Sequence, residues 1–183
     1  MASYYSRLAL LQKNQIYEDV ATSQYRAGVA LIVRPDDHMC MIHRAVKEGD
    51  YWSGHMGFPG GREESIDDGL LQTAIRETSE EIGVDILPEQ CMGRLSDLHH
   101  PKLQVAAFVF SLEAHCEFVL EKSEVAEVYW LPLSAFSDPS YRGTRTATYK
   151  GKEYQAPVVN IGSADVWGIS LRFIEDLLRR LDS

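Results

Sequence analysis

The sequence contains few cysteines, no long hydrophobic run and a deficit of basic residues. Its three cysteines, Cys40, Cys91 and Cys116, are widely spaced and form no Cys-x-x-Cys pair. An odd number of cysteines at this spacing indicates neither a disulfide framework nor a structural zinc site. We therefore expect a protein of a reducing compartment, the cytoplasm.

Long apolar segments are missing as well. The longest stretches, residues 27–33 and 105–110, are far shorter than the ~20 residues that a membrane-spanning helix needs. Residues 1–14 lack a basic segment followed by a long apolar one, which is the pattern of a secretory signal. We expect no membrane partner.

Basic residues are outnumbered by acidic ones: 18 Lys and Arg stand against 27 Asp and Glu, a net charge of −9. A negative net charge disfavours binding to the phosphate backbone of nucleic acid, so we expect no nucleic-acid partner. An acidic chain can still bind a phosphate compound where its carboxylates hold a divalent cation. With 183 residues, of which 45% are apolar, the chain is long enough to form one packed domain.

The apolar pattern predicts a layered α/β domain with a mixed β-sheet. Strands are expected at residues 27–33, 39–42, 93–98, 103–112 and 125–131, and a hairpin over residues 146–156. Helical spacing runs from Ser65 to Gly83, where the glycine ends the helix, and again over residues 164–181. We assign residues 1–24 to an N-terminal arm or helix and residues 25–183 to the main domain.

The helix that follows Ser65 carries a group of carboxylates. Glu77, Glu80 and Glu81 fall within roughly 100° of one another, opposite the apolar stripe. Like charges so close repel one another unless the face is fully solvated or holds a cation, and carboxylate oxygens suit Mg²⁺ or Mn²⁺. Arg76 lies one turn before Glu80 and can pair with it. A solvated acidic face and a metal site are both open on this pattern alone.

A glycine pair precedes the acidic helix. The run Phe58-Pro59-Gly60-Gly61 lets the backbone approach a ligand closely, and a carbonyl there could complete a metal shell. The segment Arg76-Glu77-Thr78-Ser79-Glu80-Glu81-Ile82-Gly83-Val84 begins fifteen residues after Gly61. Together the two segments resemble the signature of the Nudix hydrolases.

Two departures narrow the resemblance to one branch of the family. The interval from Gly61 to Arg76 is one residue longer than usual, and Asp68 stands at the place of the first glutamate. This longer box resembles that of the coenzyme A pyrophosphatases, whose layout is also followed by Arg44 and by residues 52–61, with Trp52 replacing a histidine. Further likeness to this branch is found in residues 124–133 and 166–170.

The resemblance implies the Nudix fold, an α/β/α sandwich with a mixed β-sheet. It also implies Mg²⁺ or Mn²⁺ as cofactor, bound principally by Glu77 and Glu81, with contributions from Glu80 and the Gly61 carbonyl. Further roles follow for residues outside that ligand set: Arg76 orients the glutamates, Glu124 is a candidate general base in competition with the helix glutamates, and Arg44, Arg62, Trp52 and Gly60 contact substrate.

Asp68 and Gly83 are expected to be structural. Asp68 forms a Ser-x-x-Asp pattern with Ser65 and either caps the helix or pairs with Arg76. Arg44 and Arg62 have the alternative of being surface arginines, and Trp52 packs as readily into the core as on a base.

The implied activity is metal-dependent hydrolysis of the diphosphate bond in a nucleoside diphosphate linked to another moiety. Coenzyme A or acyl-coenzyme A is the first substrate, giving adenosine 3′,5′-bisphosphate and a phosphopantetheine. The alternatives are a pyrophosphatase acting on ADP-ribose, nucleotide sugars or dinucleoside polyphosphates, and a nucleotide-sensing module without turnover. The expected partners are a small nucleotide and a second copy of the chain in a homodimer, because the segment from Tyr4 to Leu11 is apolar.

Overall fold

The computed structural model describes residues 3–11, 16, 23–50, 52–100, 102–113, 116–149 and 151–182. Its larger sheet runs in the order β3-β2-β1-β7-β5, with β4 paired to β1, β6 to β7 and β8 to β2. The strands are β1 (Tyr25–Val33), β2 (His38–Arg44), β3 (Met56–Gly57), β4 (Gly60–Arg62), β5 (Cys91–Arg94), β6 (Leu98–His100), β7 (Leu103–Ser111) and β8 (Val125–Pro132). Strands β1 and β7 are parallel whereas β1 and β2 are antiparallel, which confirms the mixed sheet.

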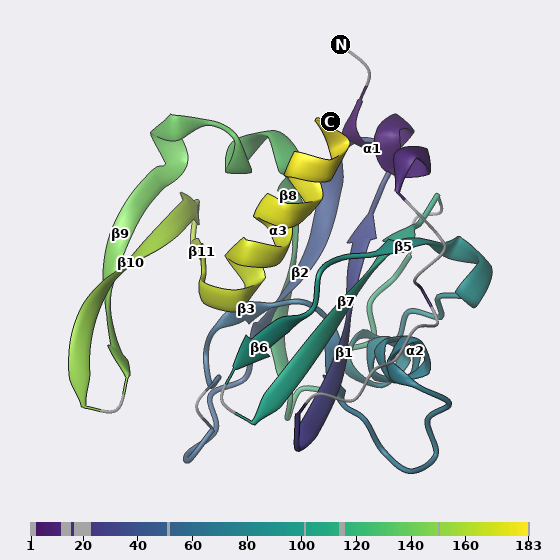
Figure 1. Cartoon of the computed structure of the whole chain (residues 1–183), viewed down its shortest axis with the longest axis horizontal. Helices are drawn as coiled ribbons and strands as arrows, with labels where there is room; N and C mark the ends of the chain where they lie inside the picture. Colours follow the sequence, from purple (N-terminus) through teal and green to yellow (C-terminus); the bar gives the residue numbers. More distant parts are fainter. Residues whose placement is uncertain are drawn as a thin grey trace.

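Helices cover both faces of this sheet (Figure 1). Side chains alternate along β1: Leu31 and Val33 pack with helix α3 (Gly168–Leu181), whereas Ala30 and Ile32 pack with helix α2 (Leu70–Ile82). A strand buried on both faces is apolar at nearly every position, which is the pattern that the sequence shows here. The expected α/β/α sandwich is confirmed.

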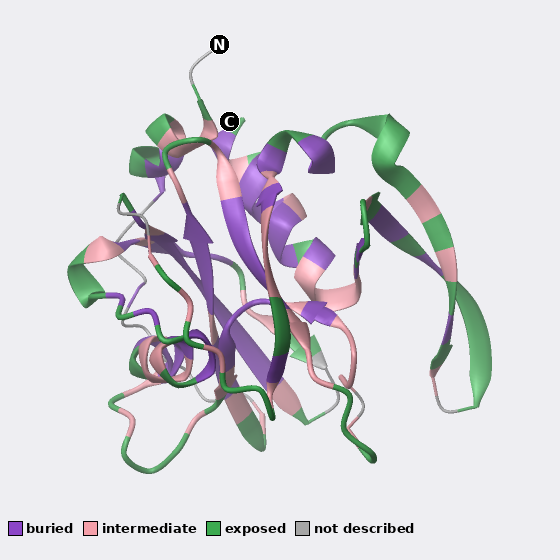
Figure 2. Cartoon of the chain, turned by 180° about the vertical axis from the view of Figure 1, so that it is seen from behind, coloured by how far each residue is buried: buried purple, intermediate pink, exposed green. Residues whose placement is uncertain are grey.

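A smaller sheet stands beside the sandwich, in the order β11-β10-β9. It consists of β9 (Arg142–Tyr149), β10 (Lys152–Ile161) and β11 (Ala164–Trp167). Figure 2 shows its hairpin, β9 with β10, projecting from the body with most of its length exposed. The expected hairpin is confirmed, and it is longer than its sequence pattern indicated.

Three expected boundaries are wrong. The last helix begins at Gly168 rather than residue 164, because Ala164 and Val166 alternate with exposed Asp165 in a strand paired to β10. The acidic helix begins at Leu70 rather than Ser65, with Gly69 as its N-cap, and Gly83 ends it in the left-handed conformation as expected. The strand expected at residues 93–98 is divided between β5 and β6.

The N-terminal segment packs on its own chain. Helix α1 (Tyr4–Arg7) leads into a short 3-10 helix, η1 (Leu8–Leu10), whose Leu8 is buried in the core beside α3. Arg7 Nη1 donates to the Leu181 carbonyl at 2.8 Å. Leu8 is therefore not available to a partner subunit. Residues 1–2, 12–15 and 17–22 of the expected arm lie outside the described residues. The remaining short helices are η3 (Pro88–Gln90), η4 (Leu133–Phe136) and η5 (Pro139–Tyr141).

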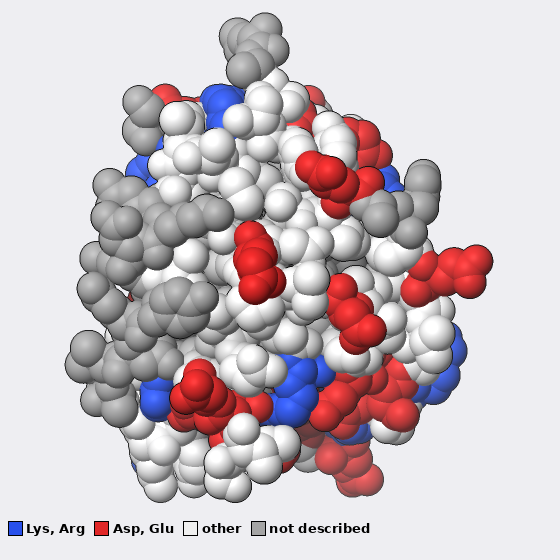
Figure 3. Space-filling model, turned by 90° about the vertical axis from the view of Figure 1, so that its right-hand side faces the viewer, with Lys and Arg blue, Asp and Glu red and all other residues white. Residues whose placement is uncertain are grey.

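The negative net charge is visible on the face at the right of Figure 1, where acidic side chains predominate over basic ones (Figure 3). In the part of the chain that the structure describes, no helix is both long and apolar enough to cross a membrane.

Candidate active site

Three carboxylates meet beside the glycine pair. Oxygen atoms of Glu77, Glu81 and Glu124 all lie within 4.8 Å of one another. Glu77 and Glu81 stand one turn apart on α2, so that both face the same way, and Glu124 immediately precedes β8. Three oxygen donors at this spacing form a site that hard divalent cations such as Mg²⁺ or Mn²⁺ prefer.

Glu81 lies deepest of the three, with 2% of its surface exposed. Its Oε2 accepts a hydrogen bond from the Gly60 amide at 2.9 Å, and Arg44 Nη1 is 3.7 Å from its Oε1. Burial raises the pKa of this carboxyl to about 8, and the Gly60 amide and Arg44 offset only part of that effect. A buried carboxylate with so little compensating positive charge fits a bound cation, so the donor set matches the implied metal.

Glu77 lies against the second glycine of the pair. A Cβ at Gly61 would overlap the Glu77 carboxylate, so that glycine alone leaves room for the side chain. Arg76 Nη1 donates to Glu77 Oε1 at 2.9 Å. Burial nevertheless raises the pKa of Glu77 above its ordinary value, since it outweighs the contribution of Arg76.

We expect Gly61→Ala to weaken Mn²⁺ binding about tenfold, because the new methyl group displaces the Glu77 carboxylate. Calorimetric titration of the full chain with Mn²⁺ measures the change. Gly57→Ala is the matched control, since a Cβ at Gly57 meets nothing within 4 Å. Equal Mn²⁺ affinities for the two variants would contradict the placement of Glu77 in the site.

Glu124 reaches the site through the loop that precedes β8. The Val119 amide donates to the Ile82 carbonyl and the Glu121 amide to the Glu81 carbonyl, each at 3.0 Å. These bonds satisfy carbonyls at the C-terminal end of α2 and hold the loop against the helix. Lys47 Nζ then lies 3.2 Å from Glu124 Oε1. The loop thus delivers a third carboxylate to the pair on the helix.

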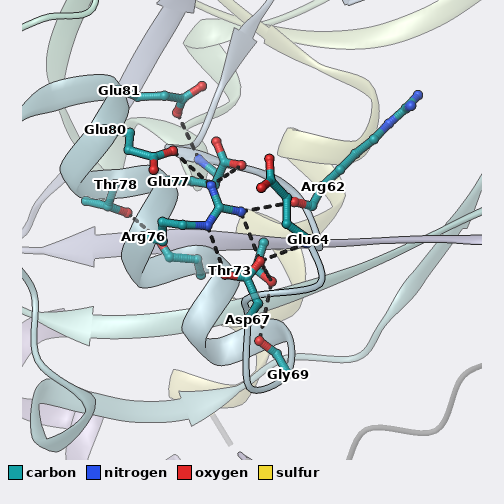
Figure 4. A network of polar contacts seen from close by, with 12 residues as sticks. Arg62, Glu64, Asp67, Gly69, Thr73, Arg76, Glu77, Thr78, Glu80 and Glu81 are labelled. Atoms are coloured by element: carbon teal, nitrogen blue, oxygen red, sulfur yellow. Dashed lines mark hydrogen bonds and ion pairs between the residues drawn. The ribbon is translucent and has the colours of Figure 1, made fainter.

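Arg76 lies at the centre of a polar network (Figure 4). Its Nε and Nη2 bond both oxygens of Asp67, at 2.8 and 2.9 Å, and its Nη1 bonds Glu80 at 2.8 Å. The pairing expected with Glu80 is confirmed. The partner expected at Asp68 is wrong: it is the preceding residue, Asp67, because the loop before α2 turns that side chain inward. Capping by Asp68 is wrong too, since Gly69 is the N-cap.

Glu80 lies apart from the carboxylate group. Its side chain is 59% exposed and its Oε2 is paired with Arg76. The three carboxylates that meet are Glu77, Glu81 and Glu124. The contribution of Glu80 to metal binding stays a prediction.

A cleft of about 640 Å³ opens over the carboxylates. The expected substrate contacts all line it: Arg44, Arg62, Trp52 and Gly60. Among the described residues, the buried Nε of Arg44 has no hydrogen-bond partner, whereas its Nη1 and Nη2 lie 3.7 Å from Glu81 and 3.4 Å from Asp50.

Several cleft residues had no expected role. Lys47 and Asp50 lie between β2 and β3, and Ser170 and Phe173 belong to α3. The α3 residues are more than a hundred positions from the glycine pair along the chain. Ser170 falls in the segment 166–170 that resembles the coenzyme A branch, but that likeness gave neither residue a place in the cleft, which the packed structure shows.

The raised pKa of Glu81 predicts a pH effect in the metal-free protein. A carboxyl that is protonated more readily in the folded than in the unfolded state stabilises the fold at low pH, and this stability is lost as the pH rises toward about 8. Between about pH 6 and pH 8, in the presence of a chelator, Glu81→Gln should gain about 2 kcal/mol relative to the native chain. Urea unfolding at the two pH values measures this gain, and a difference that does not change with pH would contradict the raised pKa of the buried Glu81 carboxyl.

The chain was compared with known proteins. The chain is 31% identical over 133 residues to human mitochondrial coenzyme A diphosphatase NUDT8, covering 70% of this chain and 56% of that protein. It is 36% identical over 106 residues to an uncharacterized Schizosaccharomyces pombe protein, C14C4.10c, covering 53% and 32%. The chain thus spans about a third to little more than half of the length of these two relatives.

A solved structure shares the fold. The MutT/nudix family protein from Enterococcus faecalis superposes with a TM-score of 0.57 at 14% identity, covering 90% of this chain and 65% of that one. The NUDIX domain matches residues 23–150, a span that includes the glycine pair, α2 and Glu124. By this match, the chain belongs to the Nudix family.

Proposed function

We propose that the protein hydrolyses the diphosphate bond of a nucleoside diphosphate linked to another moiety, with Mg²⁺ or Mn²⁺ as cofactor. The observation that carries this proposal is the meeting of Glu77, Glu81 and Glu124 beneath a cleft that also presents Arg44 and Arg62. A diphosphate is bound well where carboxylates hold cations and arginines in the same cleft bond its phosphate oxygens.

The three carboxylates divide the chemical work. Glu77 and Glu81 would hold the cation, which when bound neutralises phosphate charge and acidifies a water molecule. Glu124 is the proposed base: one of its oxygens takes the proton of the attacking water. The water oxygen forms a bond to one phosphorus, the bridging P–O bond breaks, and the bridging oxygen leaves on the other phosphate. Lys47, paired with Glu124, orients that carboxylate.

Coenzyme A, or an acyl-coenzyme A, is the substrate that we propose. Support comes from the likeness to human NUDT8, whose name describes a coenzyme A diphosphatase. It also comes from Arg44, which follows the coenzyme A branch layout and lies 3.7 Å from Glu81 in the cleft. The products would be adenosine 3′,5′-bisphosphate and a phosphopantetheine.

Trp52 favours a second candidate substrate class. It replaces the histidine of the coenzyme A branch and lines the cleft, where its ring could read a different group. ADP-ribose, a nucleotide sugar or a dinucleoside polyphosphate would then be cleaved by the same carboxylates.

A substrate panel tests the proposal. The purified chain is incubated with Mg²⁺ or Mn²⁺ and coenzyme A, acetyl-coenzyme A, ADP-ribose, a nucleotide sugar, diadenosine polyphosphates and nucleoside triphosphates, in water enriched in ¹⁸O. Mass spectra of the products identify the substrate and the phosphorus that was attacked. Cleavage of ADP-ribose with coenzyme A intact would replace the first substrate by the second, and no cleavage of any compound would leave a nucleotide-sensing module.

We also propose that the chain forms a homodimer, as members of the family it resembles often do, and that it works in the cytoplasm, as its three widely spaced cysteines favour. Light scattering of the purified protein tests the oligomeric state. A mass equal to a single chain at micromolar concentration would contradict the dimer.

A further inference from the structure

A second hollow adjoins the cleft. It has a volume of about 490 Å³ and lies between the β9–β10 hairpin and the start of α3; we call it the hairpin pocket. It borders the cleft, because the two share five lining residues, Trp52, His55, Met56, Ile169 and Ser170. A ligand whose diphosphate lies over the carboxylates therefore has the hairpin pocket next to it.

Aromatic rings run from the cleft into this pocket. The Trp52 and His55 rings stand edge to face at 6.2 Å between centroids, and the His55 and Trp167 rings at 4.9 Å. On the far side, Tyr149 and Tyr154 both line the pocket. Since Tyr149 pairs with Lys152, Tyr149 and Tyr154 are diagonal neighbours on one face of the hairpin. Tyr154 is 44% exposed, so much of its ring is open to a ligand.

The charge of the hairpin pocket differs from that of the cleft. Of the described residues that line the pocket, none is acidic, and Arg172 is basic. Next to the pocket, the guanidinium of Arg145 lies over the ring of Trp167, a lining residue, 4.4 Å from its centroid. The cleft, in contrast, is lined by acidic and basic residues together: Asp50, Glu77, Glu81 and Glu124 beside Arg44, Lys47 and Arg62. Flat rings with nearby arginines suit a nucleobase that carries a phosphorylated ribose.

We propose that the hairpin pocket binds the nucleoside of the substrate, with the base against Tyr154 and a ribose phosphate toward Arg172. This inference rests on the proposed function in one respect, that the diphosphate lies over the carboxylates. The pocket volume lies within the range of small-molecule sites. The non-nucleotide part of the substrate then extends along the cleft, away from the hairpin.

Binding of two product fragments tests the proposal without requiring turnover. Calorimetry with Mg²⁺ measures the Kd of adenosine 3′,5′-bisphosphate and of 4′-phosphopantetheine for the full chain and for variants. Tyr154→Ala should weaken adenosine 3′,5′-bisphosphate about tenfold, because it removes a stacking partner of the base, and leave 4′-phosphopantetheine within about twofold. Tyr154→Phe, which keeps the ring, should bind like the native chain.

Tyr141→Ala is the matched control, since Tyr141 is also exposed and lies on η5, outside the residues that line the pocket. Arg172→Ala should weaken adenosine 3′,5′-bisphosphate more than adenosine 5′-monophosphate. The proposal is overturned if the native chain does not bind the bisphosphate, if Tyr154→Ala leaves its Kd unchanged, or if 4′-phosphopantetheine is the fragment that loses affinity. Tyr154-dependent binding without hydrolysis of any substrate would overturn the proposed activity and leave the nucleoside site standing.

Discussion

Glu81→Gln is expected to lower the rate of diphosphate hydrolysis by roughly a thousandfold while the fold is kept. Gln is close to Glu in volume and its amide oxygen can still accept the hydrogen bond from the Gly60 amide. What the substitution removes is the negative charge of one of the three carboxylates at the cation site. Steady-state kinetics on the best substrate of the panel, with saturating Mn²⁺, measure the effect.

Glu127→Gln is the matched control for this variant. Glu127 is an exposed carboxylate on β8, three residues after Glu124, and it accepts a hydrogen bond from the Tyr129 hydroxyl at 2.6 Å. The same chemical change at this position should leave the rate within about twofold. If Glu81→Gln shows near-native activity and a native-like far-UV circular dichroism spectrum, the role of Glu81 as a metal ligand is refuted.

Asp67→Ala is expected to destabilise the protein by roughly 3 kcal/mol, because it breaks a buried ion pair. The Asp67 side chain is 1% exposed and accepts bonds from Arg76, from the Thr73 hydroxyl and from the Glu64 amide. Its removal also frees the guanidinium that orients Glu77, so hydrolysis should slow as well. Urea unfolding monitored by tryptophan fluorescence measures the stability.

Asp68→Ala is the control, and it separates two adjacent residues of the same type. Asp68 is exposed, so its replacement should change the free energy of unfolding by no more than about 0.5 kcal/mol. An equal decrease in the free energy of unfolding for Asp67→Ala and Asp68→Ala would contradict the hydrogen-bond network around Arg76.

The ion pair between Asp67 and Arg76 also predicts how the stability of the protein changes at acid pH. Bonding to Arg76 lowers the pKa of Asp67 to about 2. A carboxyl whose pKa is lowered by folding stabilises the protein above its ordinary pKa, and this stability is lost as the pH falls through that value toward about 2. Asp67→Ala should therefore differ most from the native chain near neutral pH and least at the acid end.

Much of the fold follows from local pattern. The apolar run of residues 27–33 and the helical spacing before Gly83 predict a strand and a helix, and both are present as β1 and α2. One boundary failed where a tertiary pairing competes with local spacing. Residues 164–167 read as the first turn of a helix, but pairing with β10 holds them in a strand. Hydrogen bonds to a partner strand are not visible in the spacing of one segment.

The sequence by itself determined which face of α2 carries Glu77 and Glu81, because residues four apart on a helix always lie on one side. It also determined that Gly61 stands beside them, through the resemblance to a known family. Only the tertiary structure decided that Glu124 completes the group, that Asp67 rather than Asp68 holds Arg76, and that an aromatic pocket adjoins the cleft. Helical spacing is fixed by local backbone geometry, whereas these contacts join segments whose approach depends on how α2, the loop before β8 and the hairpin pack together.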